Sequence, residues 1–204
     1  MGEYVIETDK GILQFTINRE KKRNAINYEV MRGLEQVLDK AKNPSIKALV
    51  IKGSGTKAFC SGGDLSAFHQ LYSKEDAFGM LSKMGKILYS LATLSKPTFC
   101  YINGLAVGGG AEIATACDVV AIHENGKVGF VQGTLGITTG WGGGTLLFQK
   151  LQQEKAMEML LSSTLYEPSD LKKMGFVQQI VESENEALEY FSVFLHHSAQ
   201  VLEA

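Results

Sequence analysis

The chain has 204 residues, of which 45% are hydrophobic and 21% charged, a composition typical of one globular domain with its own hydrophobic core. Its formal net charge of −2, with no block of basic residues, excludes a general attraction to nucleic acid or to acidic membranes. No apolar run is long enough to span a bilayer, and the N-terminus lacks the pattern of a signal peptide, so we expect a cytoplasmic protein. Cys60, Cys100 and Cys117 stand far apart beside apolar residues, which predicts reduced core thiols rather than disulfides or a metal site.

The N-terminal part predicts a hairpin, a helix and a buried strand. Two β-type runs, Tyr4 to Glu7 and Ile12 to Ile17, flank a turn at Asp9 to Gly11. Asn27 is a candidate helix N-cap. The apolar residues that follow it recur at helical spacing: Met31, Leu34, Val37, Leu38 and Ala41. The run from Ile46 to Ile51 predicts a buried strand that leads into the glycine loop KGSGTKAFCSGGDL.

A second strand with a glycine loop follows. Apolar residues step at helical spacing from Glu75 to Leu94, and Pro97 ends that helix before a strand from Thr98 to Ile102. Asp118 to His123 and Val128 to Phe130 are short strand candidates on either side of a turn at ENGK.

The remainder, beyond GTLGITTGWGGGT, reads mainly as helices. Ser183 and Glu186 form a capping box for the last helix, which we expect to run to the C-terminus. The chain has no fixed-period repeat, but strand-loop-helix units recur. The sequence therefore predicts an α/β fold whose loops gather at one edge of its sheets.

Two predicted strands each deliver a glycine loop, Ser61-Gly62-Gly63-Asp64 and Gly108-Gly109-Gly110. If the loops converge, each can aim a backbone N–H at one point, with the second N–H at the start of a helix. Such a pair forms an oxyanion hole, which stabilises an oxygen that gains negative charge in a transition state. Taken singly, each loop is better explained as a tight turn between a strand and a helix, and the pair of matched loops beside a carboxylate favours the oxyanion hole.

Nucleotide binding is the competing interpretation of a glycine loop. A Rossmann fingerprint requires a different glycine spacing and an acidic residue at the end of a strand roughly 20 residues further on, which this chain lacks. A P-loop is excluded because neither loop ends in Gly-Lys-Ser/Thr.

The stretches FTINREKKRNAIN, AFCSGGDL, INGLAVGGGAEIATACD and GTLGITTGWGGG stand in the order and approximate spacing of one known family. Together they resemble the crotonase superfamily, also called the enoyl-CoA hydratase/isomerase family, from about Ile12 to Val181. The resemblance implies a crotonase-type α/β spiral of β-β-α repeats with a helical C-terminal segment. It also implies that backbone N–H groups of Gly63 and Gly109 bind the thioester oxygen of an acyl-CoA, with no cofactor, because coenzyme A is part of the substrate.

The resemblance further implies which residues contact the substrate. The coenzyme A moiety would lie against Arg23, Ala25 and Ile26 and along the stretch that contains Ala58, Ser61, Gly62, Asp64 and Leu65, with Gly108 beside the thioester. Arg23 could meet a phosphate or be a solvated surface residue. We expect Asp64 to orient the first loop through local N–H groups. Trp141 could line the acyl pocket or be a core residue.

Family members that hydrate a double bond use two glutamates as acid and base. The first matches Glu112, although an acidic residue in a first helical turn is also favoured by the helix macrodipole. The second position is occupied by Gln132, whose amide cannot exchange a proton at neutral pH but can hold a substrate by hydrogen bonds.

Three functions remain open. Decarboxylation of a malonyl-type acyl-CoA needs the oxyanion hole and at most one acid, and GGGAEIATACD with the tryptophan of GWGGG most resembles the ethylmalonyl-CoA decarboxylase branch. The alternatives are a hydratase or isomerase with its second acid elsewhere, and an acyl-CoA binding protein without catalysis.

The C-terminal end is expected to differ from that of the family. We divide the chain into a spiral core at residues 1–182 and the start of a helical segment at residues 183–204. Family members continue with further helices that complete a trimer, so the resemblance implies a homotrimer or hexamer and a shortened C-terminal segment.

Overall fold

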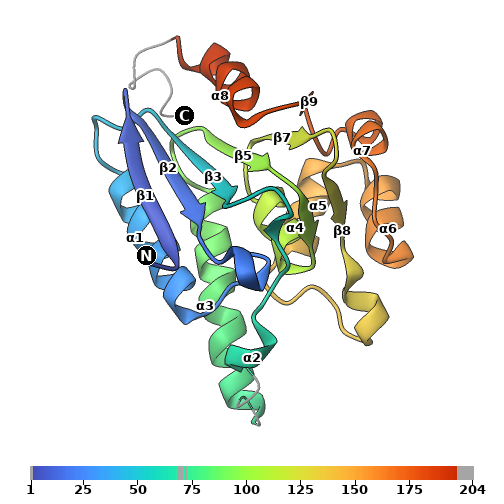
Figure 1. Cartoon of the computed structure of the whole chain (residues 1–204). Coiled ribbons are helices and arrows are strands. Elements are labelled where there is room, and N and C mark those ends of the chain that lie inside the picture. The colour runs from blue at the N-terminus through green and yellow to red at the C-terminus, as the bar shows by residue number, and fades with distance from the viewer. Residues whose placement is uncertain (1, 69–70, 72, 197–204) are drawn as a thin grey trace.

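The computed structural model describes residues 2–68, 71 and 73–196, which form two sheets with helices packed around them (Figure 1). Among these residues the larger sheet has six strands, in the order β1-β2-β3-β5-β7-β9, and the smaller has three, in the order β4-β6-β8. The strands of the larger sheet are β1 (Tyr4–Asp9), β2 (Ile12–Ile17), β3 (Ala48–Gly53), β5 (Thr98–Ile102), β7 (Val119–His123) and β9 (Gln179–Val181). Those of the smaller sheet are β4 (Ala58–Cys60), β6 (Leu105–Val107) and β8 (Lys127–Gly129).

The chain alternates between the two sheets. After the antiparallel β1–β2 hairpin, every pairing in both sheets is parallel among the described strands. Each turn of the chain places one strand in the larger sheet and the next in the smaller sheet, and a helix follows: β3-β4-α2, β5-β6-α4 and β7-β8-η2. The predicted spiral of β-β-α repeats is confirmed. The turn at ENGK is present, but it connects two sheets, since β7 and β8 do not pair.

Two helices begin at the caps that the sequence predicted. The Asn27 side chain accepts a hydrogen bond from the Val30 N–H at 3.0 Å, and the Ser183 hydroxyl accepts one from the Glu186 N–H at 3.3 Å. The helices are α1 (Tyr28–Ala41), α2 (Leu65–Phe68), α3 (Lys74–Ala92), α4 (Gly109–Thr115), α5 (Gly143–Lys150), α6 (Gln153–Ser162), α7 (Pro168–Met174) and α8 (Glu184–Ser192). Short 3₁₀ turns lie at η1 (Glu20–Lys22), η2 (Val131–Leu135) and η3 (Val193–Leu195).

The last helix is shorter than expected. The prediction that it runs to the terminus is wrong for the described residues, because α8 ends at Ser192 and the η3 turn follows it. Residues 197–204 lie outside the described part of the chain. None of the described helices is both long and apolar enough to cross a bilayer.

Both faces of the central strand β3 are buried. Leu49 and Ile51 of β3 pack into the core shared with α1 and α3, whereas Ala48 and Val50 of the same strand face the cluster under α8. Phe191 of α8 stacks on Phe99 of β5, with ring centroids 4.7 Å apart. Figure 1 shows α8 at one end of the molecule, away from α1 and α3. Burial on both faces explains the continuous apolar run of this strand.

Candidate active site

The two glycine loops meet because their strands are neighbours. β4 and β6 pair in parallel, with Ala58 opposite Leu105, so their carboxyl ends lie side by side. A Cβ atom on Gly62 would lie 3.2 Å from the backbone nitrogen of Gly109. The loops were expected to follow the longer strands β3 and β5, but the three-residue strands of the smaller sheet deliver both of them. The convergence that an oxyanion hole requires is therefore present.

Each loop presents a backbone N–H without an acceptor. The Ile26 N–H donates to the Gly62 carbonyl and the Asp64 N–H donates to the Ile26 carbonyl, both at 2.8 Å, which leaves the Gly63 N–H between them unused. Gly109 is the first residue of α4, so its N–H has no acceptor within the helix. Within the described residues, neither the Gly63 nor the Gly109 N–H donates a hydrogen bond.

Each of the three consecutive positions of the second loop requires glycine for a different reason. Gly108 has a φ of +56°, which favours glycine. A Cβ on Gly109 would lie 2.0 Å from Cζ3 of Trp141, and a Cβ on Gly110 would lie 2.1 Å from the carbonyl oxygen of Cys60. The space beside the α-carbons of Gly109 and Gly110 is thus filled by the protein itself.

The first loop is held by a buried ion pair. The Arg19 guanidinium donates to the Asp64 carboxylate at 2.7 Å and to the Ala25 carbonyl at 2.5 Å. The Arg19 and Asp64 side chains are 9% and 7% exposed. Ser66 donates to the other Asp64 oxygen from both its N–H and its hydroxyl. Burial alone would raise the pKa of Asp64, but the hydrogen bonds from Ser66 and Arg19 and the Arg19 charge outweigh burial and lower it to about 2.

Glu112 is buried one helical turn after Gly109. Only 2% of its surface is exposed, and its Oε2 accepts hydrogen bonds from the N–H groups of Trp141 at 3.0 Å and Gly143 at 2.8 Å. Burial raises the pKa of Glu112 above its ordinary value, while the bonds from Gly143, Trp141 and Gln132 act in the opposite direction. Glu112 is therefore a fixed carboxyl group able to hold a proton at a higher pH than an exposed glutamate.

Gln132 lies directly against this carboxyl group. Its Nε2 donates to Glu112 Oε1 at 3.1 Å, and its own Oε1 is buried without a hydrogen-bond partner. A Cβ on Gly108 would lie 4.0 Å from Gln132 Cδ, so the amide also borders the second loop. The structure brings together Gly63, Gly109, Glu112 and Gln132, as the sequence predicted for one site.

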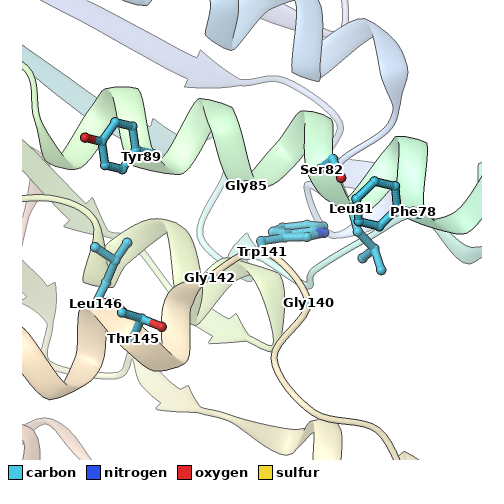
Figure 2. A pocket seen from close by; sticks show the side chains of 10 residues that line it. All are labelled: Phe78, Leu81, Ser82, Gly85, Tyr89, Gly140, Trp141, Gly142, Thr145 and Leu146. Carbon is cyan, nitrogen blue, oxygen red and sulfur yellow. The ribbon is translucent and has the colours of Figure 1, made fainter.

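Trp141 connects the loops to a cavity of about 460 Å³ between α3 and the start of α5. Figure 2 shows its indole beneath α3, reaching toward Leu81 and Phe78, while Leu146 lies toward the other end of the cavity. A Cβ on Gly63 would lie 3.5 Å from indole Cζ2, so the benzo ring touches both loops. Trp141 is 5% exposed and is at once a core residue and a wall of this cavity.

The predicted coenzyme A contacts fall into two groups. Arg23 is exposed and Leu65 is 77% exposed, so both side chains can meet a ligand. Ala25, Ile26 and Ala58 are buried, which leaves their backbone as the part available for contact. Ser61 is half-buried beside the first loop, and its N–H donates to the Arg23 carbonyl at 3.1 Å.

Sequence reasoning missed Arg19 and the two N–H donors to Glu112. Arg19 stands in the same basic stretch as Arg23, and only its burial against Asp64 separates the two. The N–H groups of Trp141 and Gly143 lie 29 and 31 residues from Glu112 in the sequence, so no local pattern could assign them. Among the described residues, no cluster of three or more His, Cys, Asp or Glu side chains could hold a metal ion.

Comparison with known proteins relates the chain to one family. Residues 7–201 match the Enoyl-CoA hydratase/isomerase family. The chain is 30% identical over 184 residues to a short-chain-enoyl-CoA hydratase of Clostridium acetobutylicum, covering 89% of this chain and 70% of that protein. It is also 30% identical over 174 residues to the ethylmalonyl-CoA decarboxylase of Xenopus tropicalis, covering 85% of this chain and 58% of the relative.

A solved structure, that of an enoyl-CoA hydratase from Thermoplasma volcanium, superposes with a TM-score of 0.92 at 24% identity, over all of this chain and 81% of that one. At this identity the superposition shows the fold alone. The family match over residues 7–201 shows that the chain belongs to the enoyl-CoA hydratase/isomerase family, the crotonase superfamily.

Proposed function

We propose that the chain binds an acyl-CoA thioester with the thioester oxygen at the Gly63 and Gly109 N–H groups. Both donors lack an acceptor among the described residues, and the two loops are in contact. An oxygen that becomes negative in an enolate gains more from two fixed donors than a neutral carbonyl does. The loss of one such donor elsewhere costs about 2.7 to 4 kcal/mol of transition-state stabilisation.

Coenzyme A would bind along the η1 turn and the first loop. Lys21, Lys22 and Arg23 are consecutive and exposed, next to the loop that carries Gly63, and can meet the phosphates of coenzyme A. The acyl group would enter the cavity beside Trp141, whose lining is mainly apolar apart from hydroxyls such as those of Ser82 and Thr145.

The reaction that the site supports best is decarboxylation of a malonyl-type thioester. The observation that carries this proposal is Gln132, an amide held 3.1 Å from Glu112, where hydration would need a second acid or base. The bond from the α-carbon to the carboxylate breaks, CO₂ leaves, and the electron pair forms an enolate whose oxygen lies at Gly63 and Gly109. Glu112 then gives a proton to the α-carbon and regains one from solvent.

Hydration of an enoyl-CoA is the second candidate. The relative from Clostridium acetobutylicum is a hydratase, and Glu112 alone could activate a water molecule if another group supplied the proton. Acyl-CoA binding without catalysis is the third. We also propose assembly into a homotrimer or hexamer, as the family resemblance implies, and a cytoplasmic location.

The decisive experiment is mass spectrometry of ethylmalonyl-, methylmalonyl- and crotonyl-CoA after incubation with the purified protein, with Glu112→Ala as control. Loss of CO₂ from a malonyl-type thioester, reduced in the variant, supports the proposal. Addition of water to crotonyl-CoA alone establishes hydration instead. Binding of all three thioesters without any change in mass leaves a non-catalytic binding protein.

A further inference from the structure

The Gln132 amide carries a buried oxygen that nothing in the described chain satisfies. Gln132 is 8% exposed, and its Nε2 is used by Glu112 while its Oε1 has no hydrogen-bond partner. Buried side-chain acceptors are paired in most proteins, so an unpaired one that borders the second glycine loop calls for a donor from outside the chain or a change of orientation.

The proton on Glu112 decides which of these occurs. An ionised Glu112 accepts at both oxygens, so the Gln132 amide must turn its N–H toward it, as observed at 3.1 Å. A protonated Glu112 Oε1 can instead donate to Gln132 Oε1 after a half-turn of the amide. That half-turn pairs the buried oxygen and frees both N–H bonds of Nε2, while the N–H groups of Trp141 and Gly143 keep Glu112 Oε2 in place.

None of the described elements that pack most closely against α4 places a cation against the Glu112 carboxylate. Of the elements packed against α4, β4 contributes the Cys60 thiol and α5 contributes Lys150; among their described residues β6 and η2 contribute no titratable group. Lys150 donates to the Cys117 carbonyl at 2.6 Å, and neither it nor Cys60 bonds to Glu112. A ligand carboxylate next to ionised Glu112 would thus meet a like charge and an amide oxygen.

We propose that Gln132 couples acyl-group choice to the proton on Glu112: an acyl group that carries a carboxylate binds only when Glu112 has taken up a proton. With Glu112 ionised, the amide presents an acceptor, which suits a neutral acyl group or a hydroxyl donor. With Glu112 protonated, the amide presents two N–H donors to a carboxylate. This inference rests on the proposed function for the acyl-CoA class of the ligand, but not on any reaction.

The test compares two coenzyme A thioethers that cannot react, carboxypropyl-CoA and propyl-CoA. Their phosphates are identical, so the ratio of their dissociation constants isolates the carboxylate. Binding is followed by the fluorescence of Trp141, which is the one tryptophan of the chain and lines the cavity. Above the pKa of Glu112, the dissociation constant of carboxypropyl-CoA relative to that of propyl-CoA should rise about tenfold for each pH unit.

Two variants separate coupling from simple structural support. Glu112→Gln keeps the bonds to Trp141 and Gly143 and donates permanently to Gln132 Oε1, so carboxypropyl-CoA should bind tightly with no pH dependence relative to propyl-CoA. Gln132→Met removes the amide, so the affinity for carboxypropyl-CoA should fall relative to that for propyl-CoA at every pH.

Identical pH profiles for the two thioethers in the unchanged protein would overturn the inference. So would a Glu112→Gln variant that weakens carboxypropyl-CoA at all pH values. Because neither ligand can be decarboxylated, this result is independent of the assay of the proposed function. CO₂ release with a pH-independent ratio of the two dissociation constants refutes the coupling alone. A pH-dependent ratio without CO₂ release refutes the reaction alone.

Discussion

The two glycine loops present equivalent N–H groups but are held in place by different forces. The first, around Gly63, is fixed by charge, through the Arg19–Asp64 ion pair and its hydrogen bonds. The second, around Gly109, is fixed by close packing of Trp141 against the Gly109 α-carbon. A buried polar network is destabilised when the pH changes the charge of a partner or when one partner is removed, whereas close packing is destabilised by changes in side-chain volume. A change of charge should therefore displace mainly the Gly63 N–H, and a change of side-chain volume mainly the Gly109 N–H.

The largest effect is expected for Gly109→Ala. The added Cβ would lie 2.0 Å from the buried indole of Trp141, so either the loop or the ring must move. Overpacking of this kind costs about 1 to 3 kcal/mol of stability, and a displaced N–H donor costs a further factor of about 10² to 10³ in turnover. Urea unfolding and turnover of the thioester identified by mass spectrometry measure the two effects.

Gly79→Ala is the matched control for this change. Gly79 lies within α3, and a Cβ there would meet nothing within 4 Å. Because alanine is the better helix former, stability should rise by about 0.5 to 1 kcal/mol with turnover unchanged. Equal losses in the two variants would show that Trp141 does not constrain the second loop.

Arg19→Met tests the first loop. It leaves Asp64 buried without its cation, which should cost about 3 kcal/mol of unfolding free energy. The comparison variant is Lys83→Met, which removes an ion pair with Glu35 at 3.1 Å whose side chains are 34% and 48% exposed. That exposed pair should contribute under about 1 kcal/mol. A cost for Arg19→Met no larger than that for Lys83→Met would contradict a charge-held loop.

Acid should weaken the first loop selectively. The pKa of Asp64 is lowered to about 2, below its value in the unfolded chain, so its contribution is present above about pH 4 and is lost as the pH falls toward 2. Glu112 has the opposite sign, because burial raises its pKa: its ionisation destabilises the fold as the pH rises through that raised pKa. The test is the free energy of unfolding measured against pH for the unchanged chain, Asp64→Asn and Glu112→Gln. Asp64→Asn should remove the loss of stability at acid pH. Glu112→Gln should remove the loss of stability that accompanies ionisation of Glu112 at higher pH.

The sequence predicted features that depend on neighbouring residues, such as helix caps and the hairpin, and missed the short strands that depend on tertiary pairing. The Asn27 and Ser183 caps were readable because a cap and its helix are adjacent, and the hairpin was readable from its turn residues. The strands β4, β6 and β9 have three residues each, too few for a periodic pattern, so the short strands that carry both loops were read as loops.

Within the site, the sequence predicted the residues themselves but not the contacts that hold them in place. Gly63, Gly109, Glu112 and Gln132 stood in recognisable motifs, and the structure places them together. The Arg19–Asp64 pair joins residues 45 apart, and the exclusion of a Cβ at Gly110 in α4 comes from the carbonyl of Cys60 on β4. Such contacts depend on the tertiary fold, which no window along the chain contains.

The sharpest test of the comparison is Trp141→Phe. A phenyl ring lacks the outer atoms Cζ3 and Cη2 that lie 2.0 and 2.3 Å from a Cβ at Gly109, so it should leave a small void and cost about 1 kcal/mol of stability. The same void makes room for a methyl group. Gly109→Ala should therefore cost less in the Trp141→Phe background than alone, whereas Arg19→Met should cost the same in both backgrounds because it acts through the other loop. Double-mutant cycles of unfolding free energy measure both couplings, and a strictly additive Gly109–Trp141 pair would show that the second loop is held by something other than the indole.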